Sequence, residues 1–301
     1  MFEKVNPGHP DKMADRLAGA IVDLCYERAG GLATENPRVA VEVLAGHGRV
    51  TVQVETSLSR QELRAEDIDP LIYRIFGANV WRNVVIAAQD AHLSDNQMHG
   101  LRCGDNGIFK GCPTMEEQRV LTAIAGDLWE RYHSDGKYLI RKNGNCEGLP
   151  YSVTICQSNM QRGDEEAWLC EYLECGYKLN GYITINPLGP WTGGINVDCG
   201  CTNRKLGSDM GDGVTGGGLM GKDLSKADVS VNIVCYRKAV ASRQVVTAIC
   251  SIGDENVTFT YADGKTETER FADIVEQARQ YIQMVGGFEK FAEWGLIKPQ
   301  Q

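Results

Sequence analysis

Strand-like and helix-like patterns alternate along this sequence and recur loosely three times, which limits the fold more than any other feature. Valines occupy every second position in 38–45 and again in 49–56, with the tight turn Gly46-His47-Gly48 between them, as in a hairpin with one buried face. Apolar residues recur at helical spacing in 10–30, which begins at a proline, a residue favoured in the first helical turn. The other predicted elements are helix 67–77, strand 83–89, helix 116–132, strand 151–157, helix 165–174, strand 181–185, helix 223–240, strands 244–252 and 257–261, and helix 266–284. The pattern predicts an α+β protein of three repeated modules.

The charge balance excludes whole classes of partner. Forty acidic residues against 31 basic ones give a net charge of −9, whereas binding to nucleic acid or anionic membrane depends on an excess of Lys and Arg. We therefore expect no nucleic acid and no membrane partner, and a phosphate ligand requires a local basic cluster. No apolar run is long enough to span a bilayer and the first residues do not resemble a secretory signal, so we expect a cytoplasmic protein.

The eleven cysteines show no zinc-finger or C-x-x-C spacing. Reduced, buried thiols are the interpretation we favour over a metal or redox site, because free cysteine packs as a small apolar residue. This applies to Cys25, Cys156, Cys170, Cys175, Cys199, Cys201, Cys235 and Cys250.

The long segment 186–222 has almost no periodicity and is dense in Gly and Asp, which is typical of a binding segment. It ends in a loop, 216–223, that matches the phosphate-binding G-x-x-x-x-G-K pattern but has Asp223 in place of Ser or Thr. No strand pattern precedes this loop, so a P-loop fold is rejected. Exposed backbone N–H groups and a following helix could still bind phosphate. The local basic cluster is Arg204, Lys205, Lys222 and Lys226, and a solvated basic surface is the alternative.

A second constellation, Gly8-His9-Pro10-Asp11-Lys12, lies at the start of the first predicted helix. His9 could donate a hydrogen bond to a phosphate oxygen, and the carboxylate of Asp11 suits Mg²⁺. The alternative is that Asp11 only complements the helix dipole.

Four motifs in order carry a resemblance to a known family. They are GHPDK at 8–12, GDNG at 104–107, NPLG at 186–189 with Asp198 and Arg204-Lys205 downstream, and GGGLMGKDLSKAD at 216–228. Together the motifs resemble those of S-adenosylmethionine synthetase, also called methionine adenosyltransferase, in a compact and somewhat divergent form.

The resemblance implies an α+β fold of three pseudo-repeated modules with mixed sheets, whose segments interleave along the chain. It implies a central domain of 9–100 plus 191–232, an N-terminal domain of 1–8 plus 114–190, and a shortened C-terminal domain of 101–113 plus 233–301. It also implies a homodimer, or a tetramer, with active sites at the subunit interface.

The implied reaction is the synthesis of S-adenosylmethionine from ATP and L-methionine, with release of tripolyphosphate that is hydrolysed to pyrophosphate and phosphate. Mg²⁺ and K⁺ are the implied cofactors. The resemblance assigns catalysis to His9, Lys222, Arg204 and Asp105, and ATP binding to His9, Trp191, Asp198, Arg204, Lys205 and Lys222. It assigns methionine binding to Glu55, Asp198 and Lys226, Mg²⁺ to Asp11 and Asp228, and K⁺ to Glu42. Glu42 and Glu55 could instead be solvent-facing strand residues.

The sequence departs from the family at several points. Asn106 replaces the Gln of GDQG, Pro190-Trp191 replaces Arg-Phe, and the family's Asp-x-Lys nucleotide contact has Asn143 as its nearest counterpart. The segment 94–103 before the GDNG motif predicts a short lid. A catalytically weakened binding or assembly subunit and an ATP-dependent phosphohydrolase are therefore kept as alternative functions.

Overall fold

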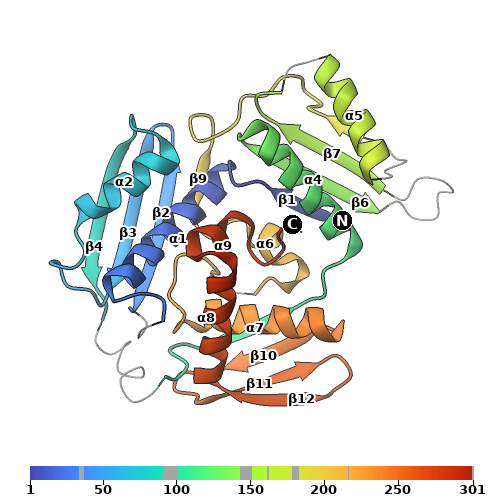
Figure 1. The fold of residues 1–301 in the computed structure, drawn as a ribbon. Coiled ribbons are helices and arrows are strands. Elements are labelled where there is room, and N and C mark those ends of the chain that lie inside the picture. Colours follow the sequence, from blue (N-terminus) through green and yellow to red (C-terminus); the bar gives the residue numbers. More distant parts are fainter. Residues whose placement is uncertain are drawn as a thin grey trace.

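The computed structural model describes residues 1–33, 37–90, 101–142, 151–160, 163–177, 183–215 and 217–299. Three four-stranded sheets make up its frame, each with helices packed on one face (Figure 1). Strands distant in sequence share a sheet, so segments of the chain interleave. The predicted α+β class with three modules and mixed sheets is confirmed, and the domain boundaries given above stay a prediction.

Each sheet joins one strand that is remote in sequence to a local set of three. The first sheet has the strand order β1 (Phe2–Val5), β6 (Gly136–Lys142), β7 (Tyr151–Gln157), β8 (Ile183–Ile185), with only β7 and β8 parallel. The second has the order β4 (Trp81–Ala88), β3 (Arg49–Thr56), β2 (Val39–Gly46), β9 (Cys199–Cys201), with only β3 and β4 parallel. The third is antiparallel, in the order β12 (Thr266–Arg270), β11 (Asn256–Tyr261), β10 (Val246–Cys250), β5 (Gly107–Gly111).

Two long helices accompany each sheet. These are α4 (Glu116–Tyr132) and α5 (Asp164–Tyr177) with the first, α1 (Pro10–Arg28) and α2 (Ala65–Phe76) with the second, and α7 (Ala227–Ser242) and α8 (Phe271–Val285) with the third. Two shorter helices, α6 (Leu206–Met210) and α9 (Phe288–Trp294), lie in the middle, where the three modules meet (Figure 1).

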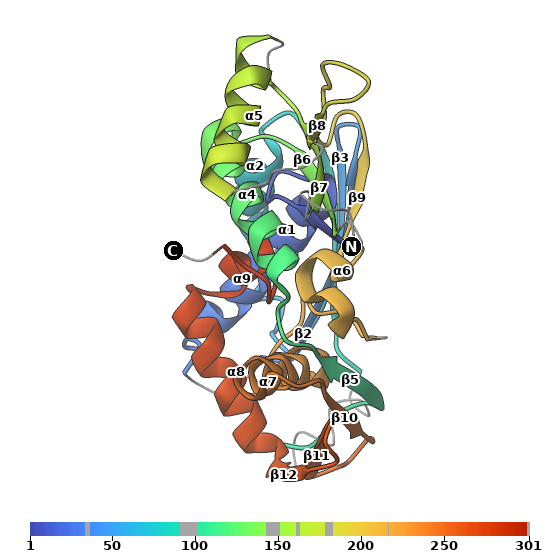
Figure 2. The same ribbon diagram turned by 90° about the vertical axis from the view of Figure 1, so that its right-hand side faces the viewer.

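In the part of the chain that the structure describes, the other face of each sheet is not covered by a long helix. In Figure 2, α4, α5 and α8 lie on one side of the molecule, and β3, β9 and β5 lie on the other. Large apolar side chains point out from this uncovered side, among them Leu44 (56% exposed), Trp81 (57%), Ile108 (68%) and Ile249 (66%). Ile108 and Ile249 are direct neighbours across the β5–β10 pair. Exposed apolar side chains gathered on one side of a molecule are typical of an interaction surface.

Two predicted helices start four or more residues too early, whereas the bounds of the others agree to within three residues. The predicted helix 223–240 begins only at residue 227, because Asp223 is buried and its carboxylate accepts hydrogen bonds from the backbone of Val39 and Ser225. The predicted helix 266–284 is wrong over residues 266–270, which form β12 and pair with β11. There the alternating Thr and Glu residues follow the period of a strand, and the helix starts at Phe271.

A cluster of buried charges ties the modules together. Lys12 of α1 lies 2.7 Å from Asp209 of α6 and 3.1 Å from Asp15, and none of the three residues is exposed. Burial opposes the charge on Lys12, but Asp209 and Asp15 outweigh it and raise the pKa of Lys12. Burial raises the pKa of Asp15 to about 7. Lys4 of β1 is also buried, and its ammonium group donates to the backbone carbonyls of Ser208, Trp294 and Ile297.

The cysteines of the described chain are free thiols. Cys25, Cys235 and Cys250 are buried as predicted, and Cys156, Cys170, Cys199 and Cys201 are half-buried. Cys175 is exposed, which corrects its expected burial, because it lies on the solvent side of the last turn of α5 beside the exposed Glu174. Within the described residues, no helix has both the length and the apolar character needed to cross a membrane.

Candidate active site

The N-terminus of α1 forms the floor of the site. His9 is the N-cap residue, with extended backbone angles (φ −65°, ψ 137°), and its Nδ1 accepts a hydrogen bond from the backbone N–H of Asp11 at 3.2 Å. Pro10 occupies the first helical position, where its missing N–H costs nothing. The predicted helix start is therefore confirmed, and its cap points the imidazole and the Asp11 carboxylate out of the helix end.

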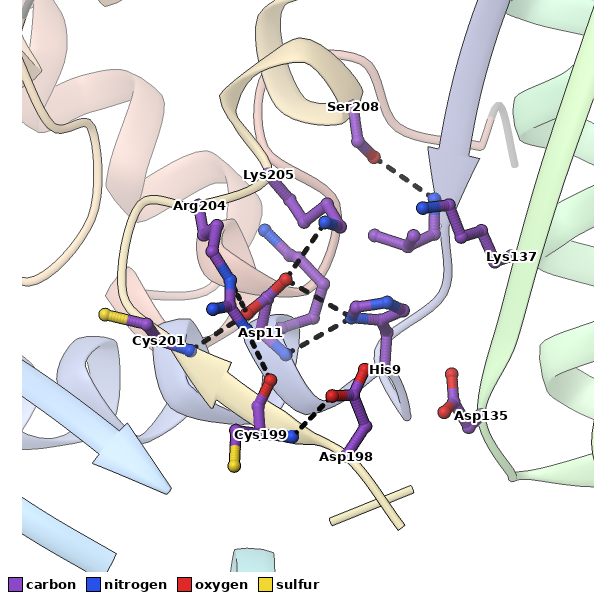
Figure 3. A network of polar contacts seen from close by, with 12 residues as sticks. His9, Asp11, Asp135, Lys137, Asp198, Cys199, Cys201, Arg204, Lys205 and Ser208 are labelled. Carbon is purple, nitrogen blue, oxygen red and sulfur yellow. Dashed lines mark hydrogen bonds and ion pairs between the residues drawn. The ribbon is translucent and has the colours of Figure 1, made fainter. Parts of the chain in front are cut away.

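The carboxylate of Asp11 is the centre of a dense polar network (Figure 3). It is 1% exposed and accepts from the backbone N–H of Cys201 at 2.9 Å and from Nε of Arg204 at 2.8 Å, and Nζ of Lys205 lies 3.0 Å away. Burial alone would raise the pKa of Asp11, but the Cys201 N–H and Lys205 outweigh burial and lower it. Asp11 is thus ionised at neutral pH, with both predicted cations held against it.

His9 is neutral at physiological pH. Burial is the main cause that lowers its pKa to about 4, and the nearby ammonium groups of Lys205 and Lys137 act in the same direction. Because Nδ1 accepts a hydrogen bond, the proton of the neutral ring is assigned to Nε2. His9 can therefore donate one hydrogen bond to a ligand without adding charge.

A cleft of about 630 Å³ opens above this network, between the first sheet, the start of α1 and the segments on either side of β9. Its lining comprises His9, Asp11, Asp135, Lys137, Cys156, residues 186–191, Asp198, Arg204 and Lys205. Lys137 and Cys156 are cross-strand neighbours in the first sheet. Of the predicted site residues, the structure brings His9, Asp11, Trp191, Asp198, Arg204 and Lys205 together here.

Asp135 and Lys137 are functional candidates that the sequence reasoning missed. Asp135 is 4% exposed, its Oδ2 accepts from the backbone N–H of Gly194 at 2.7 Å, and its Oδ1 has no partner. Burial raises the pKa of Asp135 to about 6. Residues 135–137 read Asp-Gly-Lys, so the Asp-x-Lys pattern is present at the start of β6. The nearest counterpart proposed for it, Asn143, lies outside the described residues.

Other predicted site residues lie away from this cleft. Lys222 forms an ion pair with Asp228 at the start of α7, where Lys226 is the N-cap residue. Asp105 is exposed in the loop before β5, and its Oδ1 accepts from the backbone N–H of Asn106. Of the predicted lid, 94–103, residues 94–100 lie outside the described residues.

Glu42 and Glu55 are both on the uncovered face of the second sheet. In the β2–β3 pair Glu42 is opposite Gln53, and Glu55 is opposite Ala40. Glu42 accepts a hydrogen bond from the hydroxyl of Thr202, and both glutamates are exposed. In the single chain, both glutamates are therefore solvent-facing strand residues, which is the alternative given above. Both carboxylates also lie on the side of the molecule that carries the exposed apolar residues.

The residues of the cleft fit Mg²⁺ in part. Carboxylate oxygens are the donors this ion prefers, and the unpartnered Oδ1 of Asp135 is a buried oxygen without a hydrogen bond. Asp11 could bind the ion only if a cation moved away, because Cys201, Arg204 and Lys205 occupy its oxygens. In the described part of the chain, no three His, Cys, Asp or Glu side chains are grouped as metal ligands.

The three-module fold and a cleft lined by Arg204, Lys205 and Lys137 define a class of α+β protein with a cationic cleft large enough for a nucleotide. Residues 1–75 match the family S-adenosylmethionine synthetase, N-terminal domain. The chain is 30% identical over 299 residues to S-adenosylmethionine synthase 2 of Rhodopseudomonas palustris (strain BisB18), which covers 82% of this chain and 73% of that protein. It is 27% identical over 315 residues to S-adenosylmethionine synthase 1 of Rhodospirillum rubrum, with 91% and 79% covered. The chain belongs to the S-adenosylmethionine synthase family.

A solved structure shares the fold. The structure of an unusual S-adenosylmethionine synthetase from Campylobacter jejuni superposes with a TM-score of 0.70 at 18% identity, covering 98% of this chain and 94% of that one. The three-module architecture is therefore common to both chains.

Proposed function

We propose that this chain is a methionine adenosyltransferase that makes S-adenosylmethionine from ATP and L-methionine. The observation that carries the proposal is the Asp11, Arg204 and Lys205 network under His9 in a cleft large enough for a nucleotide. The sulfur of methionine attacks C5′ of ATP, the bond from C5′ to the triphosphate oxygen breaks, and that oxygen keeps the electron pair. Tripolyphosphate leaves and is hydrolysed to pyrophosphate and phosphate.

The chain's own residues bind and orient the substrates, and no protein nucleophile takes part. Arg204 and Lys205 leave Asp11 for the more highly charged triphosphate, and the neutral His9 donates from Nε2 to a phosphate oxygen. Trp191 and Asp198 border the same cleft, where the indole can stack on adenine. Fixing the sulfur in line with C5′ supplies the remaining rate enhancement.

The proposal includes both cofactors. Mg²⁺, when bound, neutralises part of the polyphosphate charge, and Asp11 would hold it in the cleft. Asp228 is the second proposed ligand, and Glu42 is the proposed ligand of K⁺. Glu55 and Lys226 would bind the ammonium and carboxylate groups of methionine.

A homodimer would unite these groups. Lys222, Lys226, Asp228, Glu42 and Glu55 are not part of the lining of their own chain's cleft, and we propose that they reach the cleft of a partner. Two observations support a dimer formed through the uncovered side. Both glutamates lie on that side together with the exposed apolar residues. The cleft also reaches that side, because Lys137 and Cys156, which line it, lie on the uncovered face of the first sheet. Assembly of two dimers into a tetramer and a cytoplasmic location stay predictions.

A catalytically weakened subunit is the second candidate, and Pro190 favours it. This residue borders the cleft where the resemblance calls for an arginine, so one cation for the phosphates is missing. Lys137 lies in the same cleft and partly compensates, although in the free chain it pairs with Glu3 at 3.1 Å.

One assay separates the candidates. The protein is incubated with ATP, L-methionine, Mg²⁺ and K⁺, and S-adenosylmethionine is measured by chromatography, with parallel reactions that lack methionine or protein. Methionine-dependent S-adenosylmethionine supports the transferase. Phosphate release that does not need methionine indicates a phosphohydrolase, and nucleotide binding without turnover indicates a weakened subunit.

A further inference from the structure

Asn203 lies between the two cationic parts of the chain, the Arg204-Lys205 pair of the cleft and the loop 217–221 that leads to Lys222. Its backbone has φ 61°, a left-handed conformation that asparagine tolerates better than most residues. The backbone N–H of Asn203 donates to Oδ1 of the buried Asp15 at 2.8 Å. The peptide before Arg204 is therefore anchored to α1.

The side chain of Asn203 holds the loop from the other direction. Its Oδ1 accepts from the backbone N–H of Met220 at 2.7 Å, and its Nδ2 donates to the carbonyl of the same residue at 3.2 Å. The amide thus pairs with both polar groups of Met220, as a neighbouring strand would. Lys222 follows two residues later.

The glycines of the loop allow this close approach. A Cβ on Gly218 would lie 2.6 Å from Nδ2 of Asn203, and a Cβ on Gly217 would lie 1.8 Å from Oδ1 of Asp228. Both distances are far inside van der Waals contact. In this structure these two glycines therefore accommodate two polar side chains of the chain itself, one of which, Asp228, also pairs with Lys222.

We propose that Asn203 is a positioning residue that fixes the loop 217–221, and through it Lys222, relative to Arg204 and Lys205. This rests on the proposed function, in which all three cations serve the polyphosphate. Arg204 and Lys205 line the cleft of their own chain, whereas Lys222 is proposed to reach the cleft of the partner. Asn203 therefore fixes the relative position of residues that one chain contributes to two different clefts.

The first test removes the side chain and keeps the backbone conformation. Asn203→Gly is compatible with φ 61°, so the variant should fold. Without the two hydrogen bonds, hydrogen exchange of the Met220 amide should accelerate at least about tenfold, a factor that corresponds to about 1.4 kcal/mol. The matched control is Asn159→Gly, at an exposed asparagine with φ 58° that does not line the cleft. It should leave the exchange of residues 217–222 and the activity unchanged.

A double-mutant cycle tests the contact itself. Gly218→Ala introduces a methyl group against Nδ2 of Asn203, so it should also accelerate exchange at Met220. In the Asn203→Gly background the three atoms closest to this methyl group, all from the Asn203 side chain, are absent, so its added effect should be small. Additive effects of the two substitutions would overturn the proposed contact.

Kinetics separate positioning from simple structural support. With Lys222 poorly placed for the leaving group, kcat of Asn203→Gly should fall at least about tenfold while KM for methionine stays within about threefold. Unchanged exchange at Met220, or faster exchange with unchanged kcat, would overturn the positioning role in a protein that still makes S-adenosylmethionine. If the wild-type protein makes no S-adenosylmethionine but Asn203→Gly still accelerates hydrogen exchange at Met220, the anchoring of the loop is supported and the proposed function is rejected.

Discussion

Substitution of Lys12 by methionine should destabilise the protein far more than the loss of an ordinary lysine. Methionine has a similar length but no charge, so Asp15 and Asp209 would stay buried without the ammonium group that lies 3.1 Å and 2.7 Å from them. Removing one partner from a buried ion pair costs about 3–5 kcal/mol. We expect a loss of that size and a melting temperature lower by roughly 10 °C.

The effect should depend on pH in a defined direction. The folded-state pKa of Asp15 is raised to about 7, above its ordinary value of 3.8, so the folded protein binds this proton more tightly than the unfolded chain does. The stabilising contribution of Asp15 is then complete below about pH 4 and is lost as the pH rises through about 7. Loss of the Lys12 charge raises this pKa further, so Lys12→Met should cost more at pH 8 than at pH 5.5.

Urea unfolding followed by circular dichroism at both pH values measures these differences. Lys290→Met is the matched control: Lys290 is 61% exposed and pairs with Glu293 at 2.8 Å on the surface of α9. Its loss should change the free energy of unfolding by no more than about 0.5 kcal/mol. A loss below about 1 kcal/mol for Lys12→Met at pH 8, or a deficit that grows on acidification, would refute the reasoning.

Three further predictions concern the site and the assembly. Asp11→Asn and Asp228→Asn should each abolish S-adenosylmethionine synthesis while the circular dichroism spectrum stays native, because an amide lacks the charge to hold Mg²⁺; full turnover in either would remove that assignment. Gly200→Ala should cost at least about 2 kcal/mol in urea unfolding, since its Cβ would lie 2.0 Å from the carbonyl oxygen of Pro10, and a neutral result would mean that β9 can move off α1. Trp81→Glu should convert a dimer to a monomer in light scattering, because it places a charge on the uncovered face; an active wild-type monomer at assay concentration would contradict the dimer.

Local patterns predicted much of the fold. The helix over 116–132 and the strands over 49–56 and 151–157 have the predicted bounds, because their apolar period is unbroken. The short strands β1, β5 and β9 were missed, since three to five residues carry too little periodicity, and β6 was missed because three successive apolar residues, 138–140, hide its alternation. The helix α9 was missed as well, because its seven residues span only about two helical turns.

The site was only partly predictable for a different reason. Motifs located His9, Asp11, Arg204 and Lys205 correctly at one cleft, because they occur near helix and strand ends that the topology brings together. A sequence treats lysine as a surface residue, so the buried Lys12 gave no signal of its role. Nor does a motif reveal whether its residues serve their own chain or a partner.

The buried ammonium group of Lys4 also bears on how the protein is made. One of its acceptors is the carbonyl of Trp294, 290 residues further along the chain, and another is that of Ile297. During synthesis on a ribosome, β1 leaves the exit tunnel long before Trp294 and Ile297, which carry two of the three acceptors for Lys4. Until then these two carbonyls are not available, so the final hydrogen-bonded environment of Lys4 cannot form. β1 therefore reaches its final environment only after Trp294 and Ile297 are made, and a nascent chain arrested before Trp294 should still expose Lys4 to amine-reactive reagents.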